Sequence, residues 1–450
     1  MSNINKINDC LLSLAKLYEE DKLFNDAIFC YHKISKSILS TSPQIQFLNN
    51  CIARCYMLKG DYDKSIKYYL DIYNINPNIP DVLISIATCK INQKQIPDAL
   101  FFLKKSLSIK ENPDILKMIG EVYYYLKDYK ESIYYYKKSN DKYALSFSLL
   151  ATKNFKDGFK YYEYRLLSNG ICHQTGLPLR QNINLPDWDG KMPCKKLLVI
   201  YEQGIGDNIM YFRFLIQLAK KFPNIEITYF CKKIVSHFLY SHLDNLIIND
   251  DANFEIPSFD FKCFIMSIPH VLNITSISPN NLYYIKVYEK NVTKWKNILN
   301  KSKPLVGFFY KGLLKSSIDK NIDINILNNL FNLDIDFVCL HKKDEIEKDI
   351  PFFSKNIKTF DIDNNKPFED TISILKNIDL LITIDSSIVH LAGAMDIPTY
   401  LLLGPISEWR WFNNNEKVWY NSVNILHNDN KEDIYSISKI EKIIKNMFNV

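Results

Sequence analysis

The stretch "KKLLVIYEQGIGDNIMYFRFLIQLAKKFP", residues 195–223, indicates an α/β fold. It begins with an apolar run typical of a buried strand, turns at Gly204 and Gly206, and continues as an amphipathic helix. A strand, a glycine turn and a helix in this order commonly open a ligand crevice. Ile209 stands where the dinucleotide-binding fingerprint has its third glycine, and no Gly-Lys-Ser/Thr ending follows. The segment therefore favours a nucleotide-type site, but neither a nicotinamide site nor a phosphate-binding P-loop.

The composition is that of a globular protein with more than one domain. A chain of 450 residues exceeds the usual size of a single core. Its net charge of +6 is mild and its lysines are scattered, so we expect no nucleic-acid partner. The 10 cysteines have neither the spacing of a disulfide framework nor that of a zinc site. We therefore expect free, reduced cysteines and no bound metal.

The N-terminal sequence "MSNINKINDC" lacks the apolar segment of a signal peptide. No stretch of the sequence approaches the 18 apolar residues of a membrane-spanning helix. These two observations predict a cytoplasmic protein without an integral membrane segment.

Residues 1–165 carry a helical repeat of about 34 residues. Small residues recur in pairs twelve positions apart, at Ala15/Ala27, Ala53/Ser65, Ala87/Ala99 and Gly120/Ser132. A large apolar residue stands three positions before each second member: Phe24, Tyr62, Ile96 and Tyr129. The pattern resembles the tetratricopeptide repeat, whose helix pairs stack into a solenoid with a concave face that commonly holds a protein or peptide. A generic helical bundle is the alternative, and "NFKDGFKYYEYRL" is a candidate fifth, degenerate unit with Gly158 in register.

Strands and helices alternate after a connector at residues 166–195, which contains Pro and Gly and has no helical period. We expect two Rossmann-like halves, residues 196–300 and 301–450, each built on a parallel, doubly wound sheet. The second half is expected to end in an amphipathic helix. Open sheets of this kind bind ligands at the carboxyl ends of their strands, so one cleft between the halves is the expected site. The predicted fold is thus multidomain, an all-α repeat solenoid followed by an α/β pair.

The segment "IDLLITIDSSIVHLAGAMDIPTYLLLG", residues 378–404, is the sharpest motif of the second half. A buried strand ends at Asp385, and Ser386 and Ser387 are placed to cap the following helix. A serine-capped helix N-terminus in a cleft is suited to a diphosphate. Asp385 could instead accept hydrogen bonds from sugar hydroxyls, and both residue types could be caps alone. His390, on the first turn of that helix, could face either the core or a ligand.

Several motifs together resemble one family, and they span nearly the whole chain. They are "YEQGIGDNIMYFRFL", "ITIDSSIVHLAGAMDIPTYLLLG", "EWRWF" (residues 408–412), "FKDGFKYYEYRL" and "PDWDGK". They look like tetratricopeptide-repeat proteins with a heptosyltransferase-like, family nine glycosyltransferase domain. The resemblance implies the GT-B architecture, a nucleotide-sugar donor held mainly by the C-terminal half, and no requirement for a metal or cofactor.

The resemblance also implies roles for individual residues. Asp207, presented by the turn of Gly204 and Gly206, corresponds to the candidate general base, and a carboxylate there suits an inverting transfer to a hydroxyl. The glycines would let the acceptor approach the backbone. Asp207 could also simply cap the helix that begins near Asn208. The residues implied on the donor side are Asp385, Ser386, Ser387, His390, Trp409 and Arg410, although Trp409 could equally lie in the core.

One loop departs from the family pattern. Relatives carry a Trp-Ala-Gly turn and a loop with Asn-Pro, His and Arg, where this chain has "YKGLLKSSIDKNIDI", residues 310–324. Gly312 is kept, and Lys311, Lys315 and Lys320 are candidates to supply positive charge to a leaving diphosphate. Lysine lacks the bidentate fork of arginine.

The sequence therefore predicts a metal-independent glycosyltransferase of hexosyl or heptosyl type, with repeats that help to hold the acceptor. The alternative is a non-catalytic interaction scaffold with a degenerate transferase domain, which the altered 310–324 loop favours. A nucleic-acid-binding repeat protein is a third, less favoured interpretation, and it would require steep salt dependence of binding.

Overall fold

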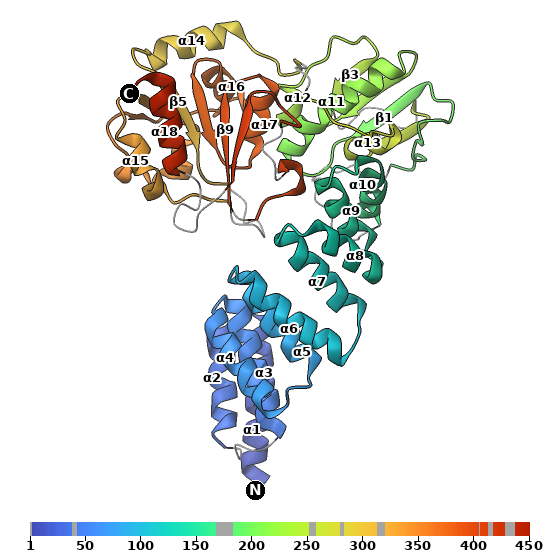
Figure 1. Cartoon of the computed structure of the whole chain (residues 1–450), viewed down its shortest axis with the longest axis vertical. Helices are drawn as coiled ribbons and strands as arrows, with labels where there is room; N and C mark the ends of the chain where they lie inside the picture. The colour runs from blue at the N-terminus through green and yellow to red at the C-terminus, as the bar shows by residue number, and fades with distance from the viewer. Residues whose placement is uncertain are drawn as a thin grey trace. The chain divides into compact units, whose positions relative to one another are not determined.

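The computed structural model of this protein describes residues 2–37, 43–167, 183–251, 258–279, 283–312, 320–404, 406–412, 417–427 and 437–450. The chain divides into two compact units, Met1–Leu149 and Leu150–Val450. Helices build the first unit, whereas the second contains two sheets with their helices (Figure 1).

The first unit consists of helix pairs in which short turns join two helices, a connection that makes them antiparallel neighbours. The second helix of each of the first three pairs also packs against the first helix of the next pair. The helices are α1 (Ser2–Glu20), α2 (Phe24–Ser35), α3 (Pro43–Lys59), α4 (Tyr62–Ile75), α5 (Pro80–Asn92), α6 (Ile96–Ile109), α7 (Pro113–Tyr125), α8 (Tyr129–Ser139) and α9 (Lys142–Ala151), the last of which crosses the division between the units.

The small residues of the predicted repeat mark the points where the two helices of a pair touch. All eight are buried. The Ser65 hydroxyl donates to the carbonyl of Ala53, and the Ser132 hydroxyl donates to that of Gly120, both at 2.8 Å. A Cβ at Gly120 would lie 2.8 Å from the ring of Tyr136 on α8. The twelve-residue spacing thus marks where the two helices of a pair come into close contact. The predicted solenoid repeat is confirmed.

The turn of each repeat has the same backbone conformation. Phe24, Tyr62, Ile96 and Tyr129 are the first residues of the second helices, as their shared place in the repeat predicts. Two positions before each stands a residue with φ between 61° and 88°: Lys22, Gly60, Lys94 and Lys127. The αL region is disfavoured for residues other than glycine, so three of these four turns hold a lysine in a costly conformation.

The first sheet of the second unit has four parallel strands in the order β3-β2-β1-β4. Its elements are β1 (Lys196–Ile200), α11 (Ile205–Lys221), β2 (Glu226–Phe230), α12 (Lys233–Ser236), β3 (Leu246–Asn249), β4 (Phe261–Phe264), η4 (Ile265–Ser267) and α13 (Ile268–Val271). The order reverses at β1, because β2 and β3 extend the sheet on one side and β4 on the other. The crevice expected at such a switch point lies beyond the end of β1, where α11 begins.

The second sheet has six parallel strands in the order β10-β9-β8-β5-β6-β7. Its switch point lies between β5 and β8. β10 was not among the strands predicted from the sequence. The elements are α14 (Glu289–Leu299), β5 (Leu305–Phe309), η5 (Ile324–Leu327), α15 (Asn328–Phe331), β6 (Asp336–Cys339), η6 (Lys343–Ile346), η7 (Ile350–Phe352), β7 (Ile357–Lys358), α16 (Glu369–Leu375), β8 (Leu380–Thr383), α17 (Ser387–Ala394), β9 (Thr399–Leu403), η8 (Trp409–Trp411), β10 (Val423–His427) and α18 (Ile437–Phe448).

A buried ion pair ties the segment before the connector to the first sheet. Arg165, in η1 (Glu163–Leu166) after α10 (Phe155–Tyr162), is fully buried and donates to both carboxylate oxygens of Glu202 at 3.1 and 2.7 Å. Arg165 also donates to Glu163 and to Ser267 in η4, which follows β4. Two of the quoted motifs, "YEYRL" and "YEQGIGD", are therefore held together by one bidentate pair at the switch point.

The division between the units falls earlier than the predicted repeat boundary at residue 165, which stays a prediction. α10 belongs to the second unit because its apolar face packs there: Phe159 is buried against the rings of Tyr211 and Phe214 on α11. Gly158, in the register of the candidate fifth repeat, lies against Leu150.

The described end of the connector adds a short extension to the first sheet. Trp188 donates its backbone N–H to the carbonyl of Lys262 on β4 at 2.8 Å, and Lys262 donates back to Pro186 at 2.9 Å. The "PDWDGK" motif thus covers the β4 edge, with Trp188 buried against Phe222. Pairing along an edge strand satisfies backbone groups that would otherwise be open to other chains.

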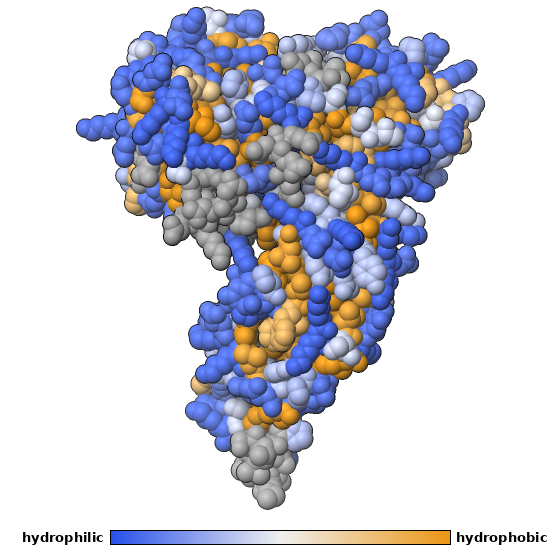
Figure 2. Space-filling view, viewed as in Figure 1, coloured by the Kyte–Doolittle hydropathy of each residue, from blue (hydrophilic) through white to orange (hydrophobic). Residues whose placement is uncertain are grey.

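The repeat unit exposes several large apolar side chains. Apolar residues gather along its face visible in Figure 2. Phe29 and Phe101 are 60% and 62% exposed, and Tyr134 is 50% exposed. Each follows the second small residue of its repeat by two positions, so they occupy equivalent places on α2, α6 and α8.

The contact between Gly120 and Tyr136 generates a stability prediction. Alanine normally favours a helix interior over glycine by about 1 kcal/mol, but overpacking costs about 1–3 kcal/mol. We expect Gly120→Ala to destabilise the wild-type repeat and to stabilise it in a Tyr136→Leu background. Hydrogen exchange of peptides from α7 and α8 measures both effects. An equal effect of Gly120→Ala in the two backgrounds would contradict this account.

The Arg165–Glu202 pair generates a second prediction. Glu202→Gln leaves a buried guanidinium without its bidentate anion, which should cost about 3 kcal/mol of unfolding free energy. Glu226→Gln is the matched control, because its pair with Lys196 is exposed and should contribute almost nothing. Urea unfolding followed by tryptophan fluorescence measures the difference, since all five tryptophans lie in the second unit. Equal losses in the two variants would show that burial of the pair is not what matters.

Candidate active site

A cavity of about 910 Å³ lies where the carboxyl ends of the two sheets face each other. The first half contributes the glycine turn after β1 and the start of α11. The second half contributes the segments that follow β5, β6, β7 and β8, together with Glu408 and Arg410 at η8. The polar and glycine residues among the lining are Gly204, Gly206, Asp207, Gly312, Lys320, Asn321, Lys342, Glu345, Asp363, Thr371, Asp385, Ser386, Ser387, His390, Glu408 and Arg410.

The N-termini of α11 and α17 meet at this cavity. A Cβ at Gly206 would lie 2.8 Å from Cδ2 of His390 and 3.3 Å from Cα of Ser387. The atoms nearest Gly206 therefore belong to α17, whereas the sequence analysis assigned the free space beside this glycine to the acceptor. Two helix N-termini side by side direct unpaired N–H groups and two positive dipole ends to one place, which suits an anion.

Asp207 uses its two carboxylate oxygens differently. Oδ2 accepts the backbone N–H of Gly204 at 3.1 Å and so caps α11. Oδ1 pairs with Nη1 of Arg410 at 2.8 Å. The capping role considered in the sequence analysis is therefore present, and the carboxylate reaches the second half at the same time.

A chain of ion pairs continues from Asp207 along the cavity wall. Nη2 of Arg410 lies 2.5 Å from Oε2 of Glu408. Nζ of Lys320 lies 2.9 Å from Oε1 of Glu408 and 2.7 Å from Oδ2 of Asp385. Two cations thus alternate with three carboxylates.

Burial and ion pairing act in opposite directions on these groups. Burial raises the pKa of Asp207 above its ordinary value, although Arg410 opposes the shift. Burial alone would lower the pKa of Lys320, but Asp385 and Glu408 outweigh it and raise that pKa. Lys320 is therefore charged at neutral pH, and Asp207 is a stronger base than an exposed aspartate.

Ser386 and Ser387 occupy the predicted positions at the start of α17. Ser386 is the N-cap residue, and its hydroxyl accepts the backbone N–H of Ile388 at 3.3 Å. Both serines line the cavity, next to Asp385. The end of β8 and the start of α17, which the sequence predicts as a strand end and a helix start, therefore lie together at the cavity.

His390 both reaches the cavity and belongs to the core. It is buried, its Nδ1 lies 3.1 Å from the hydroxyl of Tyr420, and its ring stacks on Trp411. Burial, followed by the charge of Arg410, lowers its pKa well below the ordinary value. A neutral ring is thus expected throughout the physiological range.

Two predicted donor-side residues point elsewhere. Trp409 is buried among aromatic rings, with Phe159 and Phe412 each 6.3 Å away between centroids. Nζ of Lys311 pairs with Asp349 at 2.6 Å, and its side chain does not line the cavity. Their part in donor binding stays a prediction, as does that of Lys315, which lies outside the described residues.

The described start of the altered loop after β5 is held by a histidine that sequence reasoning did not single out. Nε2 of His341 accepts the backbone N–H of Tyr310 at 3.2 Å, and its ring stacks on Phe309. Gly312 then donates its N–H to Asn321 at 2.7 Å. These bonds place Gly312 and Lys320 in the cavity wall.

Glu345, Lys342 and Glu408 line the cavity and were missed in the sequence analysis. The place of Glu345 in the sequence could have identified it as a candidate, because an acidic residue after the second strand of a doubly wound sheet commonly accepts hydrogen bonds from ribose hydroxyls. Glu408 precedes the Trp-Arg pair of "EWRWF", but only the folded chain shows that it contacts both Lys320 and Arg410.

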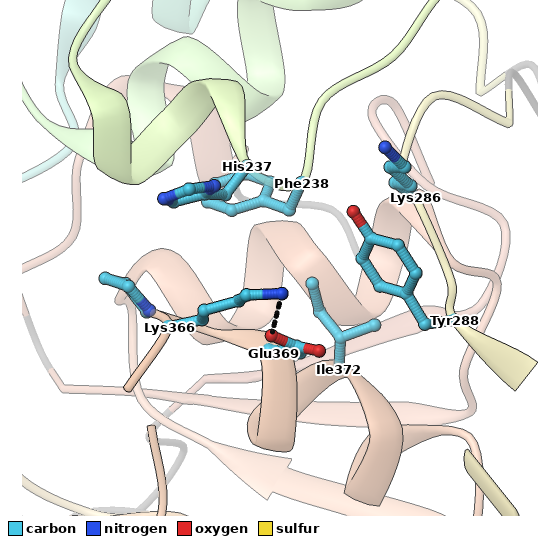
Figure 3. Close-up of a pocket in the computed structure, with 8 residues that line it drawn as sticks. His237, Phe238, Lys286, Tyr288, Lys366, Glu369 and Ile372 are labelled. Atoms are coloured by element: carbon cyan, nitrogen blue, oxygen red, sulfur yellow. Dashed lines mark ion pairs between the residues drawn. The ribbon is translucent and has the colours of Figure 1, made fainter. Parts of the chain in front are cut away.

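A second, much smaller pocket lies between α12 and α16 (Figure 3). In Figure 3, His237 and Phe238 face the side chains of Lys366, Glu369 and Ile372 across the pocket. Its volume of about 20 Å³ is roughly that of one water molecule. It therefore marks a contact of mixed polar and apolar side chains between the halves, which the Phe238–Phe368 ring pair extends to the large cavity.

Two features are absent from the described ranges of the chain. No helix there is long and apolar enough to cross a membrane. No group of three or more His, Cys, Asp or Glu side chains in those ranges could hold a metal ion.

Comparison with known proteins agrees with the repeat part of the chain. The sequence model of the family described as tetratricopeptide repeat matches residues 50–79. Protein FlbA of Caulobacter vibrioides is 20% identical over 421 residues, which cover 87% of this chain. The same alignment spans only 65% of FlbA.

Two kinds of solved structure are similar to this chain. A family 9 glycosyl transferase from Veillonella parvula is 14% identical, covers 57% of this chain and 97% of its own, and has a TM-score of 0.41. The MamA protein is 14% identical, covers 37% of this chain and 97% of its own, and has a TM-score of 0.31. The chain thus joins tetratricopeptide-type helical repeats to an α/β region with two parallel sheets.

The buried histidines generate a pH prediction for the second unit. Burial lowers the pKa of both His341 and His390 below 6.5, so below pH 6.5 the unfolded chain binds protons that the folded chain does not. Unfolding free energy should therefore fall as the pH drops from 7 to 5, by at most about 1.4 kcal/mol per pH unit for each histidine.

The contribution of His390 is measured by comparing His390→Gln with wild type in urea unfolding, followed by tryptophan fluorescence. The slope of stability against pH should be shallower in the variant. His270→Gln is the control, because that side chain is exposed and is solvated in both states. An unchanged slope in His390→Gln would contradict the prediction.

Proposed function

We propose that this protein is a glycosyltransferase of GT-B type, which moves a sugar from a nucleotide-sugar donor to an acceptor hydroxyl. One observation carries the proposal: the helix N-termini of two switch-point crevices meet at one large cavity, with carboxylates and cations in its wall. The motif resemblance to heptosyltransferase-like proteins supports the same class of reaction.

The donor diphosphate is assigned to the N-terminus of α17. Ser386 and Ser387 offer hydroxyl and backbone donors there, and the helix dipole favours negative charge. Lys320 and Arg410 are the cations that would stabilise the leaving diphosphate, in the place of a metal ion. Lys320 would supply positive charge in the 310–324 loop, where relatives carry an arginine.

The nucleoside is assigned to the wall built by the segments after β5 and β6. Glu345 is placed to accept hydrogen bonds from ribose hydroxyls, as acidic residues after a second strand commonly do. Phe309, Leu340 and Ile362 add apolar surface for the base. Asp385 would then lie close to the sugar.

Asp207 is the proposed general base. The acceptor hydroxyl would transfer its proton to Asp207 while its oxygen bonds to the anomeric carbon. The bond from that carbon to the diphosphate breaks, and the nucleoside diphosphate leaves with the electron pair. Burial raises the pKa of Asp207, which brings it nearer to the operating pH of a base.

A protein or peptide acceptor held partly by the repeats completes the proposal. The exposed aromatic side chains of Phe29, Phe101 and Tyr134 give the repeat unit apolar surface beyond what its own core uses. A cytoplasmic location fits a nucleotide-sugar substrate and stays part of the proposal.

A specific observation favours the alternative of a non-catalytic scaffold. Lys320 and Arg410 are already paired with carboxylates, so an anionic donor must compete for them. A scaffold of this kind would bind a peptide on its repeats without binding any nucleotide.

Thermal unfolding in the presence of UDP, GDP, ADP, CMP and their common sugars separates the two candidates. A ligand at a hundred times its Kd adds about 2.7 kcal/mol, which raises Tm by several degrees in a unit of this size. We expect such a shift with one nucleotide, and a smaller shift in Ser386→Ala. Ser302→Ala, an exposed change at the opposite end of β5, should behave like wild type. No shift with any nucleotide would favour the scaffold.

A further inference from the structure

Arg410 connects the two halves of the second unit through one side chain. Its Nη1 pairs with Asp207 on α11 of the first half, and its Nη2 pairs with Glu408 beside it in the second half. The side chains of Arg410 and Asp207 are only 13% and 15% exposed. The proposed base is therefore bound to a cation that the proposed donor also needs.

The charge of this cluster opposes the entry of an anion. Asp207, Asp385 and Glu408 contribute three negative charges, and Lys320 and Arg410 contribute two positive ones, so the cluster has a net charge of −1. A doubly charged diphosphate therefore competes with the carboxylates for these cations. The question is which carboxylate gives way.

Two observations indicate that Asp207 is the carboxylate that a diphosphate would replace. Its other oxygen caps α11, so the carboxylate keeps a hydrogen bond when Arg410 leaves. Nε of Arg410 is buried and, within the described part of the chain, has no acceptor. The guanidinium thus has a donor that its present partners leave unsatisfied, and a phosphate oxygen can accept from it.

The backbone of Arg410 is anchored while its side chain has alternative partners. Nε1 of Trp419 donates to the Arg410 carbonyl at 2.8 Å, and Trp409 and Trp411 on either side are buried. A change of partner at Arg410 therefore needs only side-chain rotation.

We propose that Asp207 and the donor diphosphate compete for Arg410, so that the base is masked until the donor binds. This rests on the proposed function. In the structure Arg410 pairs with the carboxylate oxygen of Asp207 that would accept the proton. Bound diphosphate takes the guanidinium, and Asp207 becomes free to receive the acceptor's proton. The donor must then bind before the acceptor can react, and the base is not available without a sugar to transfer.

The test is whether Asp207→Asn binds a nucleotide more tightly or more weakly than wild type does. Asp207→Asn keeps the size of the side chain but removes the charge that competes for Arg410. Calorimetric titration with UDP, GDP and ADP should show about fivefold tighter binding of the preferred nucleotide by the variant. The gain should shrink at high salt, because the competing charges are partly exposed. A merely structural ion pair predicts weaker or unchanged binding.

Two further variants show whether Arg410 carries the effect. Arg410→Gln should weaken binding, and Asp207→Asn added to it should bring no gain, because the contested cation is gone. Asp334→Asn is the control for net charge, since that exposed residue precedes β6, at the end of the strands opposite the cavity. Tryptophan fluorescence checks that each variant is folded.

Failure of the inference and failure of the proposed function are distinguishable. If wild type binds a nucleotide and Asp207→Asn does not bind it more tightly, competition for Arg410 is overturned while the proposed function stands. If neither wild type nor Asp207→Asn binds any of the three nucleotides, the proposed function is overturned and the inference with it.

Discussion

The cavity depends on the contact between the N-termini of α11 and α17, and that contact depends on the missing side chain of Gly206. A methyl group there would lie within 3 Å of His390, a distance that real Cβ atoms do not tolerate. The two helices belong to different sheets, and each begins at the carboxyl end of a strand next to a switch point. Their contact therefore turns two separate crevices into one site.

The same contact imposes an electrostatic constraint. Two helix N-termini side by side concentrate positive dipole ends, which favours negative charge nearby. Asp207 caps one helix, Asp385 precedes the other, and Glu408 joins them through Arg410 and Lys320. Arg410 and Lys320 thus stabilise the fold through these ion pairs, and the same two cations would bind an anionic ligand. The carboxylates and an anionic ligand therefore compete for these cations.

The first sheet is held to the preceding helix by a pair of a different character. Arg165 and Glu202 are fully desolvated and bonded at both oxygens, with Ser267 and Glu163 completing the network. Burying such a pair is costly, and its members must lie in a fixed orientation to satisfy each other. The pair holds the strand end beside Gln203, from which the glycine turn starts. It accordingly positions the backbone that presents Asp207.

Local patterns in the sequence were sufficient for the repeats, the strand–turn–helix units and the parallel sheets, because small residues at a fixed spacing, apolar runs and capping serines act over one or two elements. Asp385, Ser386 and Ser387 could be placed at a strand end and a helix start for the same reason, whereas the family resemblance singled out Asp207. The strand β10, the Glu408 bridge and the loop anchor His341 could not, since each depends on partners brought together from distant segments. Tertiary structure alone decided that Trp409 packs in the core while Arg410 reaches the cavity. It also decided that the space beside Gly206 holds a second helix, because packing between elements is set by the whole chain and not by the residues next to the glycine.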